Sequence, residues 1–375
     1  MTPTRIGNLD SPRCALVDRC GRVGIDGADW SLDWWIGGED RRHVPGEEAS
    51  LRQRRPGVAP VVETALRVPS GDAVERVYGA GGRADLVVVE IENASPVPFA
   101  AGLVVRGRPG RAAPATRVAG NWLSIGGGRA VLLPRPPLRR ETGDADAFVY
   151  PVAHRTRLRF AVVLEPGPDV PDDLGPIPGV VDVARSWDAH LSRGMRIDVA
   201  DAGFRQAVDR ARADLLLAPP DAVGAAALED WGFDAEFGRA WARLSYRARR
   251  RARRRPRGGG WAEVRACRDD GDAARFLLAL RALLVRDAGG GDLELVTELP
   301  REWLGQDLEV HDAPTRRGRV SFAVRWHGER PALLWQSEGP GGLRAPGLDP
   351  AWSADRPEGE ALLAPHPRFG VGNLQ

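Results

Sequence analysis

ADLVVVEIEN, at residues 84–93, is rich in valine and isoleucine, and PFAAGLVVRG follows it at 98–107. Three similar runs lie at 60–68, 129–134 and 156–166, and glycine, proline or asparagine separates them. β-branched residues fit the pleated surface of a strand, and the small polar residues between the runs are typical of turns. Several short strands at this spacing predict an antiparallel β-sandwich over residues 1–170.

The pattern changes after the proline-rich segment EPGPDVPDDLGPIPG at 165–179. Proline lacks a backbone donor and fixes its own φ, so this segment predicts a domain boundary. Beyond it, apolar residues recur with the 3.6-residue period of a helix, which predicts five helices in a domain at 171–290. Asp201 is the predicted N-cap of one of them. Alternating runs then predict a small β-domain with an irregular tail at 291–375.

The composition excludes several classes of protein. The 375 residues are enough for two or three compact units. The 53 basic and 51 acidic groups nearly cancel to a net charge of +2, so no overall field draws the chain to nucleic acid or to a membrane surface. The N-terminus lacks the apolar core of a signal peptide, and no run approaches the roughly 20 apolar residues that span a bilayer. We therefore expect a cytoplasmic protein without a membrane partner.

The stretch SLDWWIGGED, at 31–40, places Asp33 beside Trp34 and Trp35. An aromatic ring can stack on the apolar face of a sugar, and a carboxylate can accept hydrogen bonds from its hydroxyls. Successive residues of a strand point to opposite faces, so we expect one indole to be exposed and the other to lie in the core. These three residues are candidate ligand-binding residues.

A second cluster, LEDWGFDAEF at 228–237, surrounds Trp231 with acids. Glycosidases need two carboxyl groups across the scissile bond, and an apolar neighbour raises the pKa of the general acid. Acids near the first turn of a helix also stabilise its dipole, and we favour this structural interpretation. Trp231 is a further candidate ligand contact, and the weak catalytic candidates are Glu229, Asp230, Asp234 and Glu236.

Other motifs give no site. The three cysteines and six histidines lack the spacing of metal ligands, so we expect neither a metal nor a cofactor. The arginine run at 247–257 could neutralise phosphates, but every basic residue of this chain is arginine, and a solvated surface is the simpler explanation. We do not expect a nucleic-acid partner.

The order of the parts resembles that of a known family. CALVDRCGRVGIDGADWSLDWW, at 14–35, resembles the entry strands of bacterial glucoamylase- and trehalase-like six-hairpin glycosidases. The segment 299–336 is similar to the small β-domain that follows their helical barrel. That resemblance implies a carbohydrate function and an α+β fold: an antiparallel β-sandwich, a reduced helical region derived from an α/α barrel, and a small C-terminal β-domain.

The middle of the chain departs from this family. An (α/α)6 barrel has twelve helices, and these require on the order of 200 residues or more. Residues 178–290 have room for about half of them, and no segment matches the family's general acid or base. We therefore predict a non-catalytic, glycosidase-like protein that binds a carbohydrate or a protein partner. The alternative is an inverting hydrolase of α-linked glucosides that uses carboxylates of the 229–236 cluster.

Overall fold

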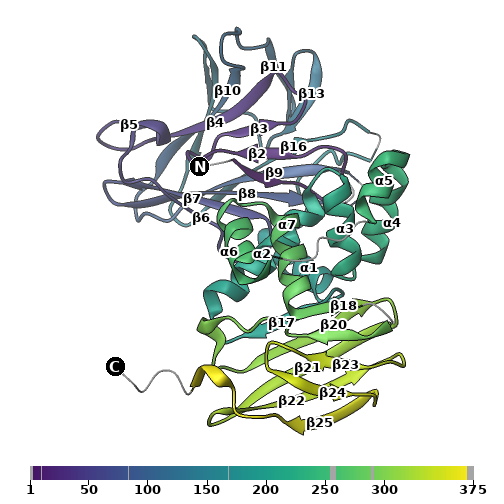
Figure 1. The fold of residues 1–375 in the computed structure, drawn as a ribbon. Helices are drawn as coiled ribbons and strands as arrows, with labels where there is room; N and C mark the ends of the chain where they lie inside the picture. Colours follow the sequence, from purple (N-terminus) through teal and green to yellow (C-terminus); the bar gives the residue numbers. More distant parts are fainter. Residues whose placement is uncertain are drawn as a thin grey trace. The chain divides into compact units, whose positions relative to one another are not determined.

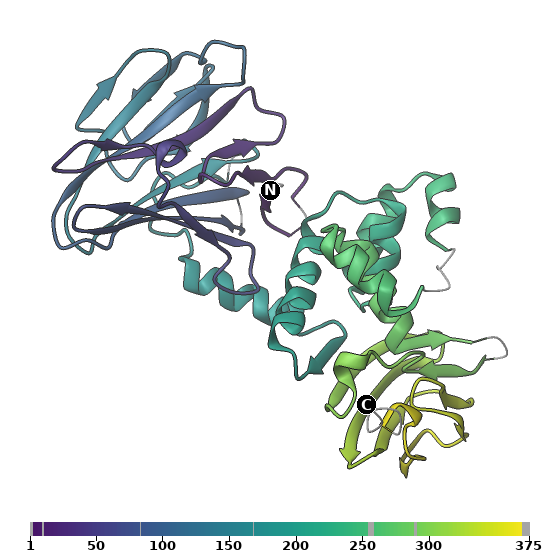
Figure 2. The ribbon, with the colours of Figure 1, turned by 60° about the vertical axis from the view of Figure 1, so that its left-hand side comes forward.

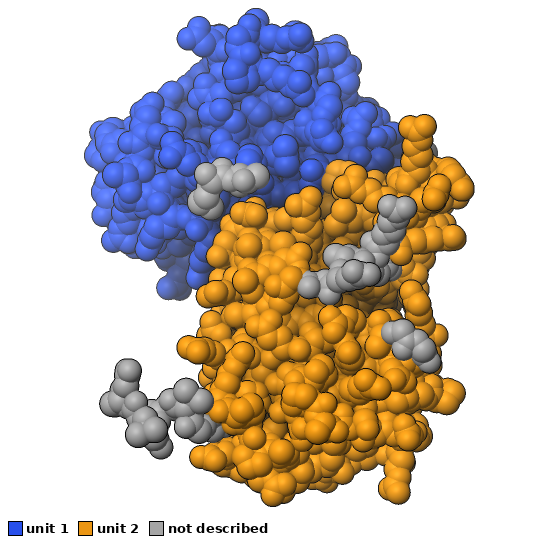
Figure 3. Space-filling model, viewed as in Figure 1, with its two compact units in different colours: residues 1–188 blue, residues 189–375 orange. Residues whose placement is uncertain are grey.

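The computed structural model describes residues 3–9, 11–82, 84–167, 169–253, 259–288 and 291–369. The chain divides into two compact units, residues 1–188 and residues 189–375 (Figure 3). Helix α1 (Val180–Leu191) contains the boundary between them. The domain boundaries that we expect near residues 170 and 290 stay predictions.

Unit 1 is built from two antiparallel sheets (Figure 1). The first has the order β1-β2-β3-β4-β10-β15-β14, with β5 paired to β4. Its strands are β1 (Thr4–Ile6), β2 (Ala15–Val17), β3 (Val23–Ile25), β4 (Trp30–Gly37), β5 (Arg42–His43), β10 (Phe99–Gly107), β14 (Arg139–Glu141) and β15 (Asp146–Val152). A short 3-10 helix, η1 (Pro45–Glu47), follows β5.

The second sheet has the order β11-β12-β13-β16-β9-β8-β7-β6. Its strands are β6 (Arg52–Arg54), β7 (Val61–Val68), β8 (Gly71–Ala80), β9 (Leu86–Asn93), β11 (Thr116–Ala119), β12 (Trp122–Ile125), β13 (Gly128–Leu132) and β16 (Arg157–Val163). The five strands expected from the valine-rich runs are all present, whereas β8 was not expected from its mixed sequence GDAVERVYGA.

The core of unit 1 lies between the two sheets. Alternate residues of β4, β9 and β10 enter it, as the period of two in a strand requires. Tyr150 of β15 meets Phe160 of β16 edge to face, with ring centroids 5.2 Å apart, and joins one sheet to the other. The antiparallel sandwich expected from the sequence is confirmed.

The carboxyl group of Glu75 is enclosed beside this core. Glu75 of β8 is 1% exposed, and its Oε2 has no hydrogen-bond partner among the described residues. A methyl group built on Gly21 would lie 2.0 Å from that oxygen, so the carboxyl lies directly under the turn that precedes β3. Burial, and to a smaller extent the charges of Asp33 and Asp18, raises the pKa of the Glu75 carboxyl well above its usual range.

Unit 2 begins with helices (Figure 2). After α1, the described residues form α2 (Ala202–Leu217), α3 (Ala222–Asp230), α4 (Asp234–Arg243), α5 (Tyr246–Ala252), α6 (Gly260–Asp269) and α7 (Ala273–Leu284). Asp201 caps α2 as expected, since its carboxylate accepts a bond of 3.0 Å from the amide of Phe204. Our expectation of five helices was wrong: α5 and α6 are additional. The sequence of α5, YRARRRA, carries no clear apolar stripe.

Two small sheets complete unit 2. One has the order β17-β20-β21-β22-β25, and the other has the order β18-β19-β23-β24. Their strands are β17 (Arg196–Val199), β18 (Val285–Asp287), β19 (Leu293–Leu295), β20 (Leu308–Thr315), β21 (Gly318–His327), β22 (Arg330–Ser337), β23 (Leu343–Ala345), β24 (Asp349–Ala354) and β25 (Glu358–Leu362). The 3-10 helix η3 (Arg301–Trp303) lies between β19 and β20, and η4 (Pro367–Phe369) follows β25. Sandwich, helices and small sheets together confirm the α+β fold.

Candidate functional site

Trp34 and Trp35 do not form an exposed aromatic surface. Their side chains are 1% and 5% exposed, so the expectation that one indole is available to a ligand is wrong. Trp34 points into the core, where its indole Nε1 donates to the carbonyl of Cys20 over 3.2 Å. Trp35 lies on the other face of β4 against its cross-strand neighbour Gly102, and the guanidinium of Arg42 lies 4.0 Å from its ring centroid. The glycine on one side and the arginine on the other enclose an indole that alternation alone would expose.

Asp33 is also buried, at 6% exposure. Its Oδ2 accepts a bond of 2.7 Å from Nε of Arg106 and a longer one of 3.4 Å from Arg22. Its Oδ1 accepts the amide of Trp34 at 2.9 Å. Both carboxylate oxygens are therefore already used by unit 1 itself, and they leave little capacity for the hydroxyls of a sugar.

Trp231 is fully buried in unit 2. It caps the C-terminus of α3, and its indole Nε1 donates to the carbonyl of Leu277 in α7 over 2.9 Å. The guanidinium of Arg212 lies 5.9 Å from its ring. Because ring and N–H both have partners inside the unit, Trp231 joins α2, α3 and α7.

The four candidate acids of the 228–237 cluster do not act together. Asp234 is exposed in the first turn of α4, where its charge favours the helix dipole. Glu236 pairs with His190 at 3.2 Å and with Arg239 at 3.0 Å, so it connects α4 to α1. Glu229 and Asp230, the last residues of α3, instead line a cleft in unit 2.

This cleft, which we call the Glu229 cleft, lies between α3, α7, β18 and β20 and has a volume of about 540 Å³. Such a volume is within the roughly 300–1,000 Å³ of small-molecule sites. It is lined by Glu229, Asp230, Arg253, Leu278, Arg281, Ala282, Val285, Arg286, Asp287, Pro314, Thr315 and Arg316. Among the described residues, this lining contains charged groups of both signs, a few apolar side chains and no aromatic ring.

The wall opposite α3 supplies a third carboxylate. Asp287 ends β18, and its Oδ1 accepts the backbone amide of Arg316 at 3.3 Å. Arg286 beside it binds Glu294 of the neighbouring strand, with 2.7 Å between Nε and Oε2. No sequence pattern could have identified Asp287 as a site residue. It lies in the same cleft as Glu229 only because α7 packs beside α3 and β18 follows α7.

The floor of the cleft is fixed by Arg281. This side chain is 5% exposed, and its guanidinium donates to the carbonyls of Val285 and Pro314. It thereby connects the end of α7 to β20 in the five-stranded sheet of unit 2. A buried guanidinium that satisfies backbone acceptors costs less than an unpaired one, and it holds the wall that carries Asp287 in place.

The cleft can therefore bind hydroxyl-rich molecules. Carboxylates accept hydrogen bonds and guanidinium groups donate them, while Leu278 and Val285 offer apolar contact. No group of three or more His, Cys, Asp or Glu side chains in the described ranges could hold a metal ion. No helix within the described part of the chain has the length and apolar character needed to cross a membrane.

Comparison with known proteins finds structural neighbours among the solved structures. No family model matches the sequence, and no curated protein matches it. The solved structure described as "Putative kojibiose phosphorylase from human microbiome" is similar to 60% of this chain at 7% identity and a TM-score of 0.36. The match spans 44% of that other chain, which is less than half of its length. A similarity this low shows neither a shared fold nor a shared activity.

Proposed function

We propose that this protein is a glycosidase-like, non-catalytic protein that binds a carbohydrate in the Glu229 cleft. The observation that supports the proposal is the cleft's lining, which combines the carboxylates of Glu229, Asp230 and Asp287 with arginines and a few apolar side chains. A volume of about 540 Å³ suits a mono- or disaccharide. This moves the predicted ligand site away from Asp33, Trp34, Trp35 and Trp231, which are all buried. The cytoplasmic location expected from the sequence belongs to the same proposal.

The absence of catalysis is supported by the number of helices. The barrel of the six-hairpin glycosidases resembled by the sequence has twelve helices, and seven α-helices are present in the described residues. Seven helices are too few to close such a ring around a sugar. The Glu229 cleft is instead bounded on one side by strands β18 and β20.

Binding is tested by calorimetric titration of the full chain with maltose, trehalose and soluble glycogen, together with a glycan array. We expect Glu229→Ala and Asp287→Ala each to weaken binding at least about fivefold, as expected when a hydrogen bond to a charged group is lost. Asp234→Ala is the matched control, because this acid is exposed on α4 outside the cleft. Binding that survives both cleft variants, or no binding to any glycan, would overturn the proposal.

The alternative function is an inverting hydrolase of α-linked glucosides. One observation favours it: carboxylates from α3 and from β18 line the same cleft, and an inverting enzyme needs two carboxyl groups on opposite sides of the bond. The test is release of glucose from maltose, trehalose and glycogen. Release above the blank that Asp287→Asn abolishes would establish this alternative and contradict the non-catalytic proposal.

A further inference from the structure

In the described part of the arginine run, helix α5 sorts four arginines into two sets, and residues 254–257 of the run lie outside the described residues. Arg249 and Arg253, four residues apart, turn toward α4, where their guanidinium carbons lie 5.7 and 5.4 Å from the ring centroid of Trp241. Arg249 also donates to the carbonyl of Trp241 over 3.0 Å. Arg247 and Arg251, also four residues apart, line a different concavity. The 3.6-residue period thus assigns one set to packing and the other to an open pocket.

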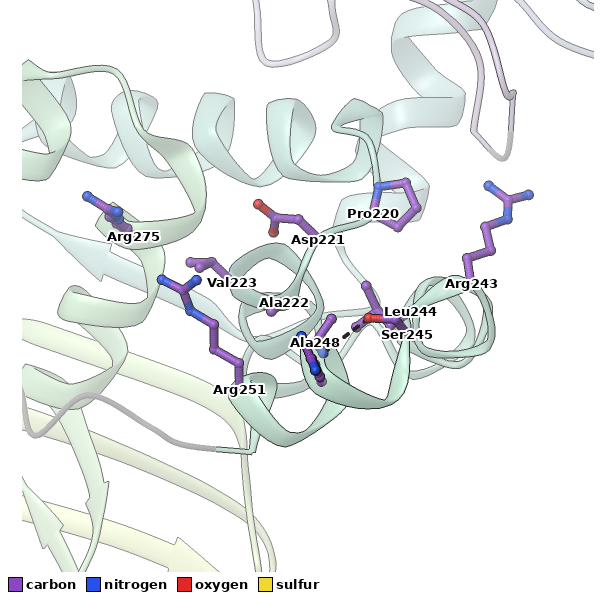
Figure 4. Close-up of a pocket in the computed structure, with 11 residues that line it drawn as sticks. Pro220, Asp221, Ala222, Val223, Arg243, Leu244, Ser245, Ala248, Arg251 and Arg275 are labelled. Atoms are coloured by element: carbon purple, nitrogen blue, oxygen red, sulfur yellow. Dashed lines mark hydrogen bonds between the residues drawn. The ribbon is translucent and has the colours of Figure 1, made fainter.

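This second concavity, which we call the arginine pocket, has a volume of about 630 Å³ (Figure 4). It lies between the start of α3, the end of α4, α5 and the first turn of α7. Its lining consists of Pro220, Asp221, Ala222, Val223, Arg243, Leu244, Ser245, Arg247, Ala248, Arg251 and Arg275. Figure 4 shows Arg251 and Arg275 on one side of Asp221 and Arg243 on the other.

The charges of the pocket do not balance. Four guanidinium groups face one carboxylate, and the carboxylate of Asp221 is already used as the cap of α3, where it accepts the amide of Gly224 at 2.6 Å. Arg275 is partly neutralised by Asp272, at 3.3 Å. Within the described part of the chain, the guanidinium groups of Arg243, Arg247 and Arg251 have no carboxylate partner.

An uncompensated positive pocket is unfavourable until an anion enters it. Arg247 and Arg251 are at i and i+4, a spacing at which like charges repel on a helix surface. A concavity lined by one sign of charge concentrates counter-ions, and guanidinium groups bind phosphate oxygens in pairs. The volume exceeds what a single ion needs and suits a small organic anion.

We propose that the arginine pocket binds a small, soluble molecule that carries phosphate groups. Arg247 and Arg251 of α5 supply the main contacts, and Arg243 and Arg275 supply the flanking charge. This site is separate from the Glu229 cleft and does not depend on carbohydrate binding there.

The test uses the full chain and calorimetric titration with inorganic phosphate, with pyrophosphate, and with vesicles that contain phosphatidic acid. We expect pyrophosphate to bind more tightly than phosphate, and both to weaken as ionic strength rises, because exposed charges are screened by salt. The vesicles should not bind, and pyrophosphate should raise the melting temperature of the wild type.

The decisive variant is Arg247→Gln/Arg251→Gln. It should weaken pyrophosphate binding at least about tenfold, since each hydrogen bond from a charged donor contributes substantially. Arg19→Gln/Arg250→Gln removes the same net charge from exposed positions outside the pocket and should bind as the wild type does. Equal weakening in both variants, no saturable binding by the wild type, or binding to vesicles alone would overturn the proposal. The thermal shift of the wild type decides the matter even if the double variant does not fold.

Discussion

Replacing Glu75 by glutamine should change how the stability of unit 1 depends on pH. The Glu75 carboxyl is enclosed, its Oε2 lacks a partner among the described residues, and its pKa is raised. In the unfolded chain the same group has a pKa of about 4.3. Between these two pKa values the folded state keeps a proton that the unfolded state has lost. The contribution of Glu75 to the unfolding free energy is therefore largest below about pH 4.3, and it falls as the pH rises toward the folded pKa.

The slope of this effect follows from linkage. One proton held by the folded state alone costs about 1.4 kcal/mol of unfolding free energy for each pH unit. Glutamine cannot ionise, so the difference between Glu75→Gln and wild type should grow in favour of the variant as the pH rises between the unfolded and the folded pKa, by at most roughly that amount per pH unit. For a unit of 188 residues, this corresponds to a melting-temperature difference of about 3–5 °C per pH unit.

The measurement is guanidinium denaturation of wild type and variant at pH 5, 6 and 7, followed by tryptophan fluorescence. Subtracting the unfolding free energy of the wild type from that of the variant at each pH removes the contribution of the other titrating groups. Glu39→Gln, at an exposed position, is the control and should give a flat difference. A flat difference for Glu75→Gln as well would refute the reasoning, because the carboxyl would then ionise in the folded state as it does in water.

Three further substitutions test packing. Gly102→Ala should cost about 1–3 kcal/mol of unfolding free energy, because the new methyl would lie 2.1 Å from a ring carbon of Trp35. Gly46→Ala is its control, because the space around Gly46 is open. It should change the unfolding free energy by less than about 1 kcal/mol in the same denaturation assay. Tyr150→Phe should cost less than about 1 kcal/mol, because the buried hydroxyl has no partner among the described residues, and a larger loss would contradict this. Arg281→Met should destabilise unit 2 by at least about 3 kcal/mol, because two backbone carbonyls lose a charged donor; a melting temperature equal to that of the wild type would contradict that role.

The sandwich was predictable because the sequences of its main strands are typical of β-strands. Runs such as 84–93 and 98–107 are short and rich in valine and other apolar residues, and this composition favours strands over helices. Strand β8 was missed because Glu75 and Arg76 interrupt its apolar pattern. Helix α5 was missed for a related reason, since arginine is common in helices, loops and exposed surfaces of this chain.

The candidate sites depended on contacts that no local pattern contains. Trp35 is covered because Gly102 is its cross-strand neighbour and Arg42 returns over it from the next strand. The cleft around Glu229 exists because Asp287, distant in sequence, ends the strand that follows α7. A composition-based interpretation of the arginine run correctly treated part of it as surface, but it could not tell which arginines the helix turns toward Trp241.

Strand β17 has a consequence for how unit 2 can be made. It lies between α1 and α2, yet the strand that pairs with it is β20, where Arg196 stands opposite His311. During synthesis the backbone groups of this edge therefore stay unpaired until β20 has emerged from the ribosome. A truncated product that stops after the helices would keep a bare edge, and such edges recruit other chains. Aggregation of such shortened products is the expected signature.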